Sequence, residues 1–519
     1  MNLLTDSAKS LYFRYLFPSF GAAMVMSIYM LVDAIVIGKG VGYLGVAALS
    51  IVLPILCLPI SLGLLFGVGG SVLMSYERGK GDNEMARNYF TVSLLGISAV
   101  TVILWLLYGF QCESILRLVG ATDAIMPYAM DYMKWIIVFF PAASFSYFLS
   151  VFVRNDKDPN RAMAGVIIGG IANCILDYVF VFPAGWGMGG AALASVTGMS
   201  IQVIVCCSHF LLKNNELKWI KPKMLAGSLG KIGETGAATF LNELSNGLIV
   251  LLFNIQILRY AGETAVSVYG VVANCAILFS SLFCGVGQAV QPLVSVNMGA
   301  KQTGRIFTFR NYGIVTAALL SVIFGGFGIL FPEATLGIFL EVKPELLEIA
   351  QTAIPLYFTA FLFMGINLFS TYFYQSILEP KGSLALSLLR SVFLSCALVF
   401  ILPLVLGLEG IWMVMPCSDT PTSSSLSSAA TRATTSYPFL KLRTPRPFLP
   451  WRWYAEDLFL FALPSAEIVK ISLSVARTAP TTSSSSPSSS ERRIAWTPAV
   501  ARPIVRTSSS PMEKRIAMP

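Results

Sequence analysis

Eleven apolar runs, each of about 20 residues or more, follow one another between Leu11 and Met415. A helix rises ~1.5 Å per residue, so each run is about long enough to cross the ~30 Å hydrocarbon core of a bilayer. Only 12% of all residues are charged and 55% are hydrophobic, which is typical of a membrane protein. We therefore predict an all-α polytopic membrane protein. The approximate spans are 11–37, 44–74, 89–110, 128–152, 162–183, 189–212, 232–259, 264–297, 308–331, 346–376 and 384–406, and a twelfth begins near residue 410.

An internal repeat runs through these spans. The segments "PAGWGMGGAA" at 183–192 and "PLVLGLEGIW" at 403–412 share one proline and two glycines, and their numbering differs by a constant offset of 220. Nearly the same offset relates four further pairs, which are Gly42 and Gly262, Gly67 and Gly285, Gly79 and Gly299, and Pro159 and Pro380. Matches in register along the chain indicate a duplicated six-helix unit. Six spans return the chain to its starting side, so we expect two six-helix bundles related by a pseudo-twofold axis along the membrane normal.

The repeat also predicts the domain organisation. We expect an N-terminal lobe at 1–213, a cytoplasmic loop at 214–230 and a C-terminal lobe at 231–419. The first lobe completes its sixth span, but residues 415–434 read "MPCSDTPTSSSLSSAATRAT", which a bilayer solvates poorly. Helix 12 is therefore expected to be truncated, and the Ser-, Thr- and Pro-rich residues 420–519 to be disordered. A shift of the reading frame near Thr420 would explain this tail, and a genuine low-complexity extension is the alternative.

Basic residues predict the orientation, because short loops rich in Lys and Arg stay in the cytoplasm. With the N-terminus inside, the inward loops and helix ends hold 18 Lys and Arg, and the outward ones hold five. The net charge of +9 arises mainly in residues 416–519, which carry 13 Lys and Arg against 6 Asp and Glu. It gives no indication of nucleic-acid binding. The nine cysteines lie mostly within predicted spans, and we expect them to be reduced packing residues.

Acidic side chains inside the spans are the strongest candidates for function, since each is costly to insert in a bilayer. Asp33 lies five residues before Gly38 and Asp177 lies six before Pro183. Both are therefore about 8 Å below the outer surface at ~1.5 Å per residue. Ser195 reaches the same level on the next span, and Asn173 is one helical turn from Asp177. These oxygens predict a site for a proton or a sodium ion, and sodium would bind at Asp33, Asn173 and Asp177. The alternative is that the acids are hydrogen-bonded for packing.

A third buried acid, Glu243, lies near the middle of the seventh span in "FLNELSNGL". Asn242 and Asn246 flank it, and the first lobe has Ala23 at the equivalent position. We expect Glu243, Asn242 and Asn246 to form a substrate site or a second cation site, with a purely structural role as the alternative. The single histidine, His209, is expected at the membrane interface. The chain has no zinc spacing, phosphate loop or nucleophile motif, which argues against an enzyme and against a cofactor other than the coupling ion.

These segments resemble the multidrug and toxic compound extrusion family of bacterial transporters over residues 1 to about 419. The resemblance rests on four sequences: "FPSFGAAMVMSIYMLVDAIVIGKGVG", "ERGKGDNEMARN", "NCILD" and "GQAVQPLVSVNMGA". It implies two lobes around a cavity that opens alternately to each side. It also implies a coupling-ion site at Asp33, Asn173, Asp177 and Ser195, a bend of the first helix at Pro18, and cation or substrate binding at Glu243.

The function that the resemblance implies is antiport. Entry of sodium or protons would drive cationic, amphipathic drugs out of a bacterial cell, across the inner membrane, and contribute to antibiotic resistance. The chain is expected to act as a monomer with its N-terminus in the cytoplasm. Two alternatives remain: a flippase of lipid-linked sugars, which would need a cationic cavity, and an inactive membrane product because helix 12 is incomplete.

Overall fold

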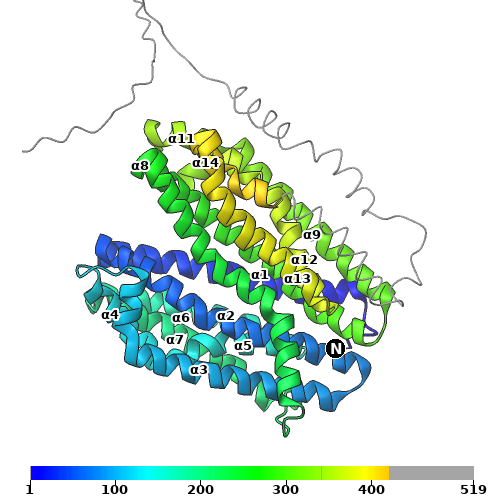
Figure 1. The fold of residues 1–519 in the computed structure, drawn as a ribbon. Coiled ribbons are helices and arrows are strands. Elements are labelled where there is room, and N and C mark those ends of the chain that lie inside the picture. The colour runs from blue at the N-terminus through cyan, green and yellow to red at the C-terminus, as the bar shows by residue number, and fades with distance from the viewer. Residues whose placement is uncertain (1, 214, 341, 420–519) are drawn as a thin grey trace, which may run out of the picture. The chain divides into compact units, whose positions relative to one another are not determined.

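The computed structural model describes residues 2–213, 215–340 and 342–419, which all belong to one compact unit. Within these residues every regular element is helical, which confirms the predicted all-α fold (Figure 1). In this described part of the chain, ten helices are long and apolar enough to span a membrane, or eleven if the bent pair α4 and α5 counts as one span. The predicted disordered tail at 420–519 and the end of helix 12 lie outside the described residues. The elements are α1 (Ala8–Gly40), α2 (Tyr43–Lys80), α3 (Asn83–Val119), α4 (Met126–Val138), α5 (Phe140–Asn155), α6 (Pro159–Val181), α7 (Gly187–Cys207), η1 (Ser208–Leu211), α8 (Leu225–Gly299), α9 (Thr303–Leu330), α10 (Pro332–Phe339), α11 (Pro344–Phe358), α12 (Phe361–Ser376), α13 (Pro380–Ser387), η2 (Leu388–Leu394) and α14 (Ser395–Trp412).

The internal repeat is present in the backbone. Gly42 and Gly262 have nearly the same conformation, with φ of 93° and 73° and ψ of −168° and −167°. Gly187 and Gly407, another pair related by the repeat, have φ of 54° and 61°. Side chains rarely adopt positive φ, so a glycine at each of these positions allows the chain to turn between two spans. At Gly262 this turn divides α8 into two spans, 225–262 and 264–299.

One span is sharply bent and another is interrupted without such a bend, which the sequence pattern did not predict. The fourth span divides at Phe139, where α4 and α5 meet at an angle of 60°. The tenth span runs from Pro344 to Ser376 with an interruption between α11 and α12 at Thr359, the position that corresponds to Phe139 in the repeat. Pro141 follows the first break and Pro355 precedes the second. Because proline cannot donate a backbone hydrogen bond, each helix is weakened near its break.

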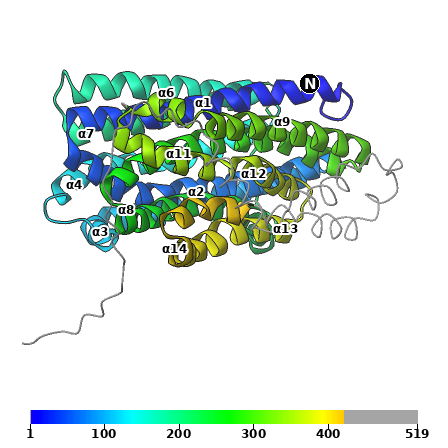
Figure 2. The same ribbon diagram turned by 90° about the horizontal axis from the view of Figure 1, so that it is seen from above.

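Each half of the chain has its own apolar core. One cluster of buried side chains draws only on residues 36–196, and another only on residues 249–415. In the second cluster Phe253 stacks on Tyr269 with ring centroids 5.2 Å apart, and Tyr269 lies beside Trp412. Trp412 is 1% exposed, so the start of the twelfth span packs into the C-terminal core. Figures 1 and 2 show α1 running beside α6, and these helices are in contact.

The two halves meet at their inner ends, by which we mean the ends beside the Lys- and Arg-rich loops. Here α2 packs closely against α8. A methyl group added at Gly79 would collide with the carbonyl oxygen of Val296, and one added at Gly299 would collide with that of Tyr76. Tyr76 and Val296 occupy corresponding positions in the repeat, as Gly79 and Gly299 do, so the two contacts are equivalent. Glycine is required on both helices because the backbones touch.

The first turns of α1 also contact the second half of the chain. Leu11, Tyr15 and Leu16 share an apolar cluster with residues of α8 and α9. The hydroxyl of Tyr12 donates a hydrogen bond to Thr316 Oγ1 at 2.6 Å. The first helix therefore joins the two halves near the N-terminus (Figure 1).

Candidate functional site

The two acids expected to share a layer lie on helices that pack side by side, Asp33 on α1 and Asp177 on α6. Asp177 is fully buried, and neither of its carboxylate oxygens meets the geometry of a hydrogen bond among the described residues, although the amide of Asn173 lies beside it. One oxygen of Asp33 is equally buried and unpartnered there. The two carboxyl groups are close enough to interact electrostatically. A buried, unpaired carboxyl is costly as an anion, so this pair favours a bound proton or cation.

Asn173 and Ser195 complete this layer from α6 and α7. The amide nitrogen of Asn173 donates a hydrogen bond to Ser195 Oγ at 3.3 Å. The amide oxygen of Asn173 is buried and has no partner within the described part of the chain. The structure thus gathers all four side chains predicted for the ion site, and leaves several of their oxygens available as ligands.

Two tyrosines that the sequence pattern did not indicate adjoin the same acids. Tyr132 on α4 is 2% exposed and lies beside Ser195, within electrostatic range of Asp33 and Asp177. Tyr29 on α1, one turn before Asp33, lies within range of that acid. The sequence prediction weighed only carboxyl groups and their nearest polar neighbours. Counting helical depth for phenol hydroxyls as well would have found Tyr132, which is six residues inside α4.

The oxygens of this layer fit a small hard cation. Asp33 and Asp177 supply two carboxyls, and Asn173, Ser195 and Tyr132 supply neutral oxygens, which are the ligands that such ions prefer. Within the described ranges no cluster of three or more His, Cys, Asp or Glu side chains is available for a metal ion. Any sodium site here must therefore draw on these neutral oxygens. A proton would need only one of the two carboxyls.

Glu243 lies elsewhere, on the first span of α8 and between the two halves. Its carboxyl is within electrostatic range of Tyr147 from the first half and of Tyr372 from the second. Asn242 is half-buried and Asn246 is exposed on the same helix.

Pro18, the position implied for a bend of the first helix, is buried inside α1. The helix continues on both sides of it from Ala8 to Gly40. Proline removes one backbone hydrogen bond from the helix interior, so α1 is weakened at this position.

A second polar group surrounds His209 at the inner end of the first half. The His209 ring is 2% exposed, with Nε2 2.7 Å from Asp156 Oδ2 and Nδ1 3.2 Å from Asp158 Oδ2. The other oxygen of Asp156 pairs with Arg78 Nη1 at 2.7 Å. Burial raises the pKa of Asp158, but hydrogen bonds from Arg161 and His209 outweigh burial and hold its pKa below the ordinary value. The residue expected at the membrane interface is thus buried in an ion cluster.

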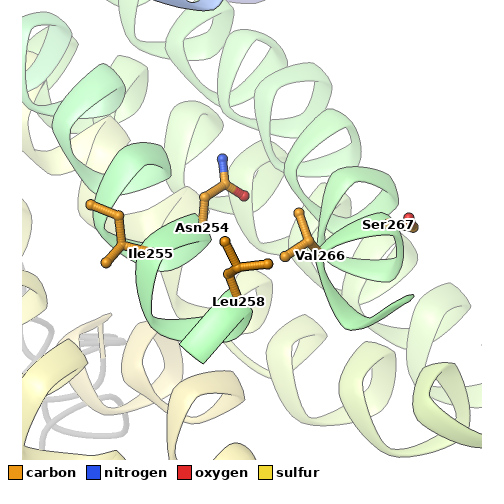
Figure 3. A pocket seen from close by; sticks show the side chains of 5 residues that line it. All are labelled: Asn254, Ile255, Leu258, Val266 and Ser267. Atoms are coloured by element: carbon orange, nitrogen blue, oxygen red, sulfur yellow. The ribbon is translucent and has the colours of Figure 1, made fainter. Parts of the chain in front are cut away.

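Two hollows in the described part of the chain are lined by residues other than the predicted site residues. One, of about 430 Å³, lies on both sides of the turn in α8 and is lined by Asn254, Ile255, Leu258, Val266 and Ser267 (Figure 3). The other, of about 180 Å³, lies at the inner end beside the His209 cluster and is lined by Arg78, Asn83, Arg87 and Glu216.

Known proteins share this architecture. The chain is 24% identical over 384 residues to the multidrug export protein MepA of Staphylococcus saprophyticus, which covers 72% of the chain and 84% of that protein. An outward-facing multidrug resistance MATE family transporter of the MOP superfamily superposes with a TM-score of 0.76 at 21% identity, covering 83% of this chain and 97% of that one. The MATE multidrug transporter DinF-BH has a TM-score of 0.76 at 26% identity, covering 85% of this chain and 100% of that one.

A family model completes the comparison. The model described as MatE matches residues 18–179 and again 238–401, one match in each half of the chain. The starts of the two matches are related by the offset of the internal repeat. The chain is therefore a multi-pass membrane transporter and belongs to the multidrug and toxic compound extrusion family.

Proposed function

We propose that this chain is a secondary antiporter that exports cationic, amphipathic compounds in exchange for sodium ions or protons. The observation that carries the proposal is the pair of buried carboxyls, Asp33 and Asp177, which no Lys, Arg or His pairs with among the described residues. A positive species that binds there neutralises a charge the protein does not balance itself. Binding can then favour one arrangement of the lobes, provided that the affinity differs between arrangements.

Glu243 is the proposed contact for the cationic substrate, with Asn242 and Asn246 beside it. Its position between the halves lets one carboxylate face a molecule held by both lobes. The proposed lobes are residues 1–213 and 231–419, in a bacterial inner membrane with the N-terminus in the cytoplasm, and the chain acts as a monomer. One charge moving down 100 mV releases about 2.3 kcal/mol, which supports a substrate concentration ratio of tens.

Transport by inside-out vesicles tests the proposal. Vesicles that contain the full-length chain should accumulate ethidium when a sodium or proton gradient is imposed, and lose it when an ionophore collapses that gradient. Asp33→Asn and Asp177→Asn should each lower the initial rate of uptake at least about tenfold, because a neutral amide has no negative charge for the coupling ion to neutralise. Asp123→Asn, at a carboxylate whose side chain is 91% exposed, is the matched control. Full transport by both amide variants would refute the proposed coupling.

The coupling ion follows from the same vesicles. Sodium coupling predicts uptake that saturates with sodium at fixed pH and fails without it. Proton coupling predicts uptake that persists in sodium-free buffer and stops when nigericin removes the pH gradient.

A further inference from the structure

Close backbone contacts line the inner seam between α2 and α8. Besides the glycine contacts near Gly79 and Gly299, a methyl group at Gly69 would collide with the carbonyl oxygen of Ile232, and one at Gly236 with that of Leu65. Such contacts permit close packing, but van der Waals contact alone distinguishes weakly between closely similar arrangements. A polar contact at the edge of the seam would add a specific preference for the closed arrangement.

Arg154, at the end of α5, makes such a contact across the seam. Its Nη1 donates a hydrogen bond to Gln288 Oε1 of α8 at 2.6 Å. Arg154 is 5% exposed, and its Nε has no hydrogen-bond partner among the described residues. The ionisable groups that act on it electrostatically are Tyr372, Cys206 and Tyr15, and none of them is a carboxylate.

A charged guanidinium buried without a counterion is costly, and a single amide oxygen repays only part of the cost. In the closed arrangement Arg154 therefore bears a desolvation cost, which water would remove by hydrating the guanidinium if the inner ends separated. The Gln288 oxygen lowers this cost only in the closed arrangement, so the contact favours closure relative to a chain that lacks the acceptor, and the remaining cost makes it easy to break.

Tyr372 supports Gln288 from the other side. The Tyr372 hydroxyl lies within hydrogen-bonding reach of the Gln288 side chain. A methyl group at Gly287, the residue before Gln288, would come within 2.5 Å of the Tyr372 ring. With its nitrogen toward Tyr372, the amide turns its oxygen toward Arg154. Tyr372 also lies within electrostatic range of Glu243, so the contact adjoins the proposed substrate site.

We propose that Arg154 and Gln288 form a latch that holds the inner ends of the two lobes together, and that Tyr372 positions Gln288 for it. The latch gives the alternating opening of the proposed function a specific closing contact on the cytoplasmic side. Its two residues come from different lobes, so the contact must break whenever the inner ends part.

Hydrogen–deuterium exchange of the full-length protein in lipid nanodiscs tests the latch without a transport assay. The informative peptides cover 65–80 of α2 and 285–299 of α8. Gln288→Leu removes the acceptor, so the inner-open population, and exchange in these peptides, should rise roughly tenfold or more. Gln288→Glu gives Arg154 a negatively charged partner on a side chain of nearly the same size, so exchange in the same peptides should fall below that of the wild type.

Matched variants separate a latch from general damage. Ser75→Ala removes an equally buried hydrogen bond, to Asn155 Oδ1 at 3.1 Å, that joins α2 and α5 within one lobe. It should leave exchange at 285–299 unchanged. Tyr372→Phe should raise that exchange, though less than Gln288→Leu does.

The opposite signs of the two Gln288 variants are decisive. Equal exchange in the wild type and both variants, or a rise in both, would overturn the latch. If Gln288→Leu does not fold, Gln288→Glu alone still decides, because only a latch predicts lower exchange. The exchange experiment does not depend on transport, so the latch and the proposed antiport can fail separately. Loss of transport in Asp33→Asn with unchanged exchange would concern only the antiport. Normal transport in a protein whose exchange shows no latch would concern only the latch.

Discussion

Asn173 and Ser195 are joined by a hydrogen bond from α6 to α7, with the amide nitrogen 3.3 Å from the hydroxyl oxygen. The bond ties the amide of Asn173 to α7, and the same amide lies beside the buried carboxyl of Asp177.

Removal of this bond should weaken ion binding more than it disturbs the fold. Ser195→Ala should raise the concentration of coupling ion needed for half-maximal transport by roughly tenfold, which corresponds to about 1.4 kcal/mol for one hydrogen bond. Ser195→Thr retains the hydroxyl and should restore the wild-type value. Ser200→Ala, which removes a hydroxyl bonded only to the Val196 carbonyl oxygen of the same helix, is the control. An unchanged ion dependence in Ser195→Ala would contradict this role.

Tyr132 should act on ion binding in the same way. Tyr132→Phe keeps the ring packed but removes an oxygen beside Ser195 and the two acids. We expect an increase of several-fold in the half-saturating ion concentration at an unchanged thermal midpoint. In Tyr108→Phe the lost hydroxyl bonds to the Ile55 carbonyl oxygen of the same lobe, at 3.1 Å. This control should lower stability slightly and leave the ion dependence unchanged. An unchanged ion dependence in Tyr132→Phe would rule out Tyr132 as a ligand.

Much of the fold was predictable because spanning a bilayer demands long apolar helices, whatever packs against them. The repeat was equally visible, since Gly42 and Gly262 both occupy a backbone conformation that other residues rarely adopt. The breaks near Phe139 and Thr359 were not predicted. Each lies inside an apolar run, where hydropathy shows no change, and only the prolines nearby indicate it.

The candidate site was predictable only in part. Depth along a helix follows from counting residues, so Asp33, Asp177 and Ser195 could be placed in one layer from the sequence. The direction in which each side chain points depends on how the helices pack, and the contribution of Tyr132 from another helix required the structure. The contact of Arg154 with Gln288 joins residues far apart in the chain and in different lobes, and no local pattern indicates such a pair.

The His209 cluster should make stability depend on pH through Asp158. Its pKa is lower in the folded protein than in the unfolded chain, so Asp158 stabilises the fold above its unfolded value of about 3.9. This contribution is lost as the pH falls through the lowered pKa. Asp158→Asn should therefore have a lower thermal midpoint than the wild type at pH 7, and the difference should shrink below about pH 4. Asp123→Asn, at an exposed carboxylate, should show no such trend. A difference that stayed constant from pH 7 to pH 3 would exclude an electrostatic origin.

Arg390 and Asp419 form a buried ion pair in the second lobe, with Nε 2.7 Å from Oδ1 and the Asp419 side chain fully buried. The amide nitrogen of Asn367 also donates to the Asp419 carbonyl oxygen at 2.8 Å, so this last described residue is tied to α12. Asp419→Ala leaves Arg390 buried without its counterion, which should destabilise the lobe by about 3–5 kcal/mol. A double variant, Arg390→Met with Asp419→Ala, removes both charges and should recover most of this loss. Thermal unfolding of the purified protein in detergent measures both effects, and a double variant as unstable as Asp419→Ala would show that the pair contributes through packing alone.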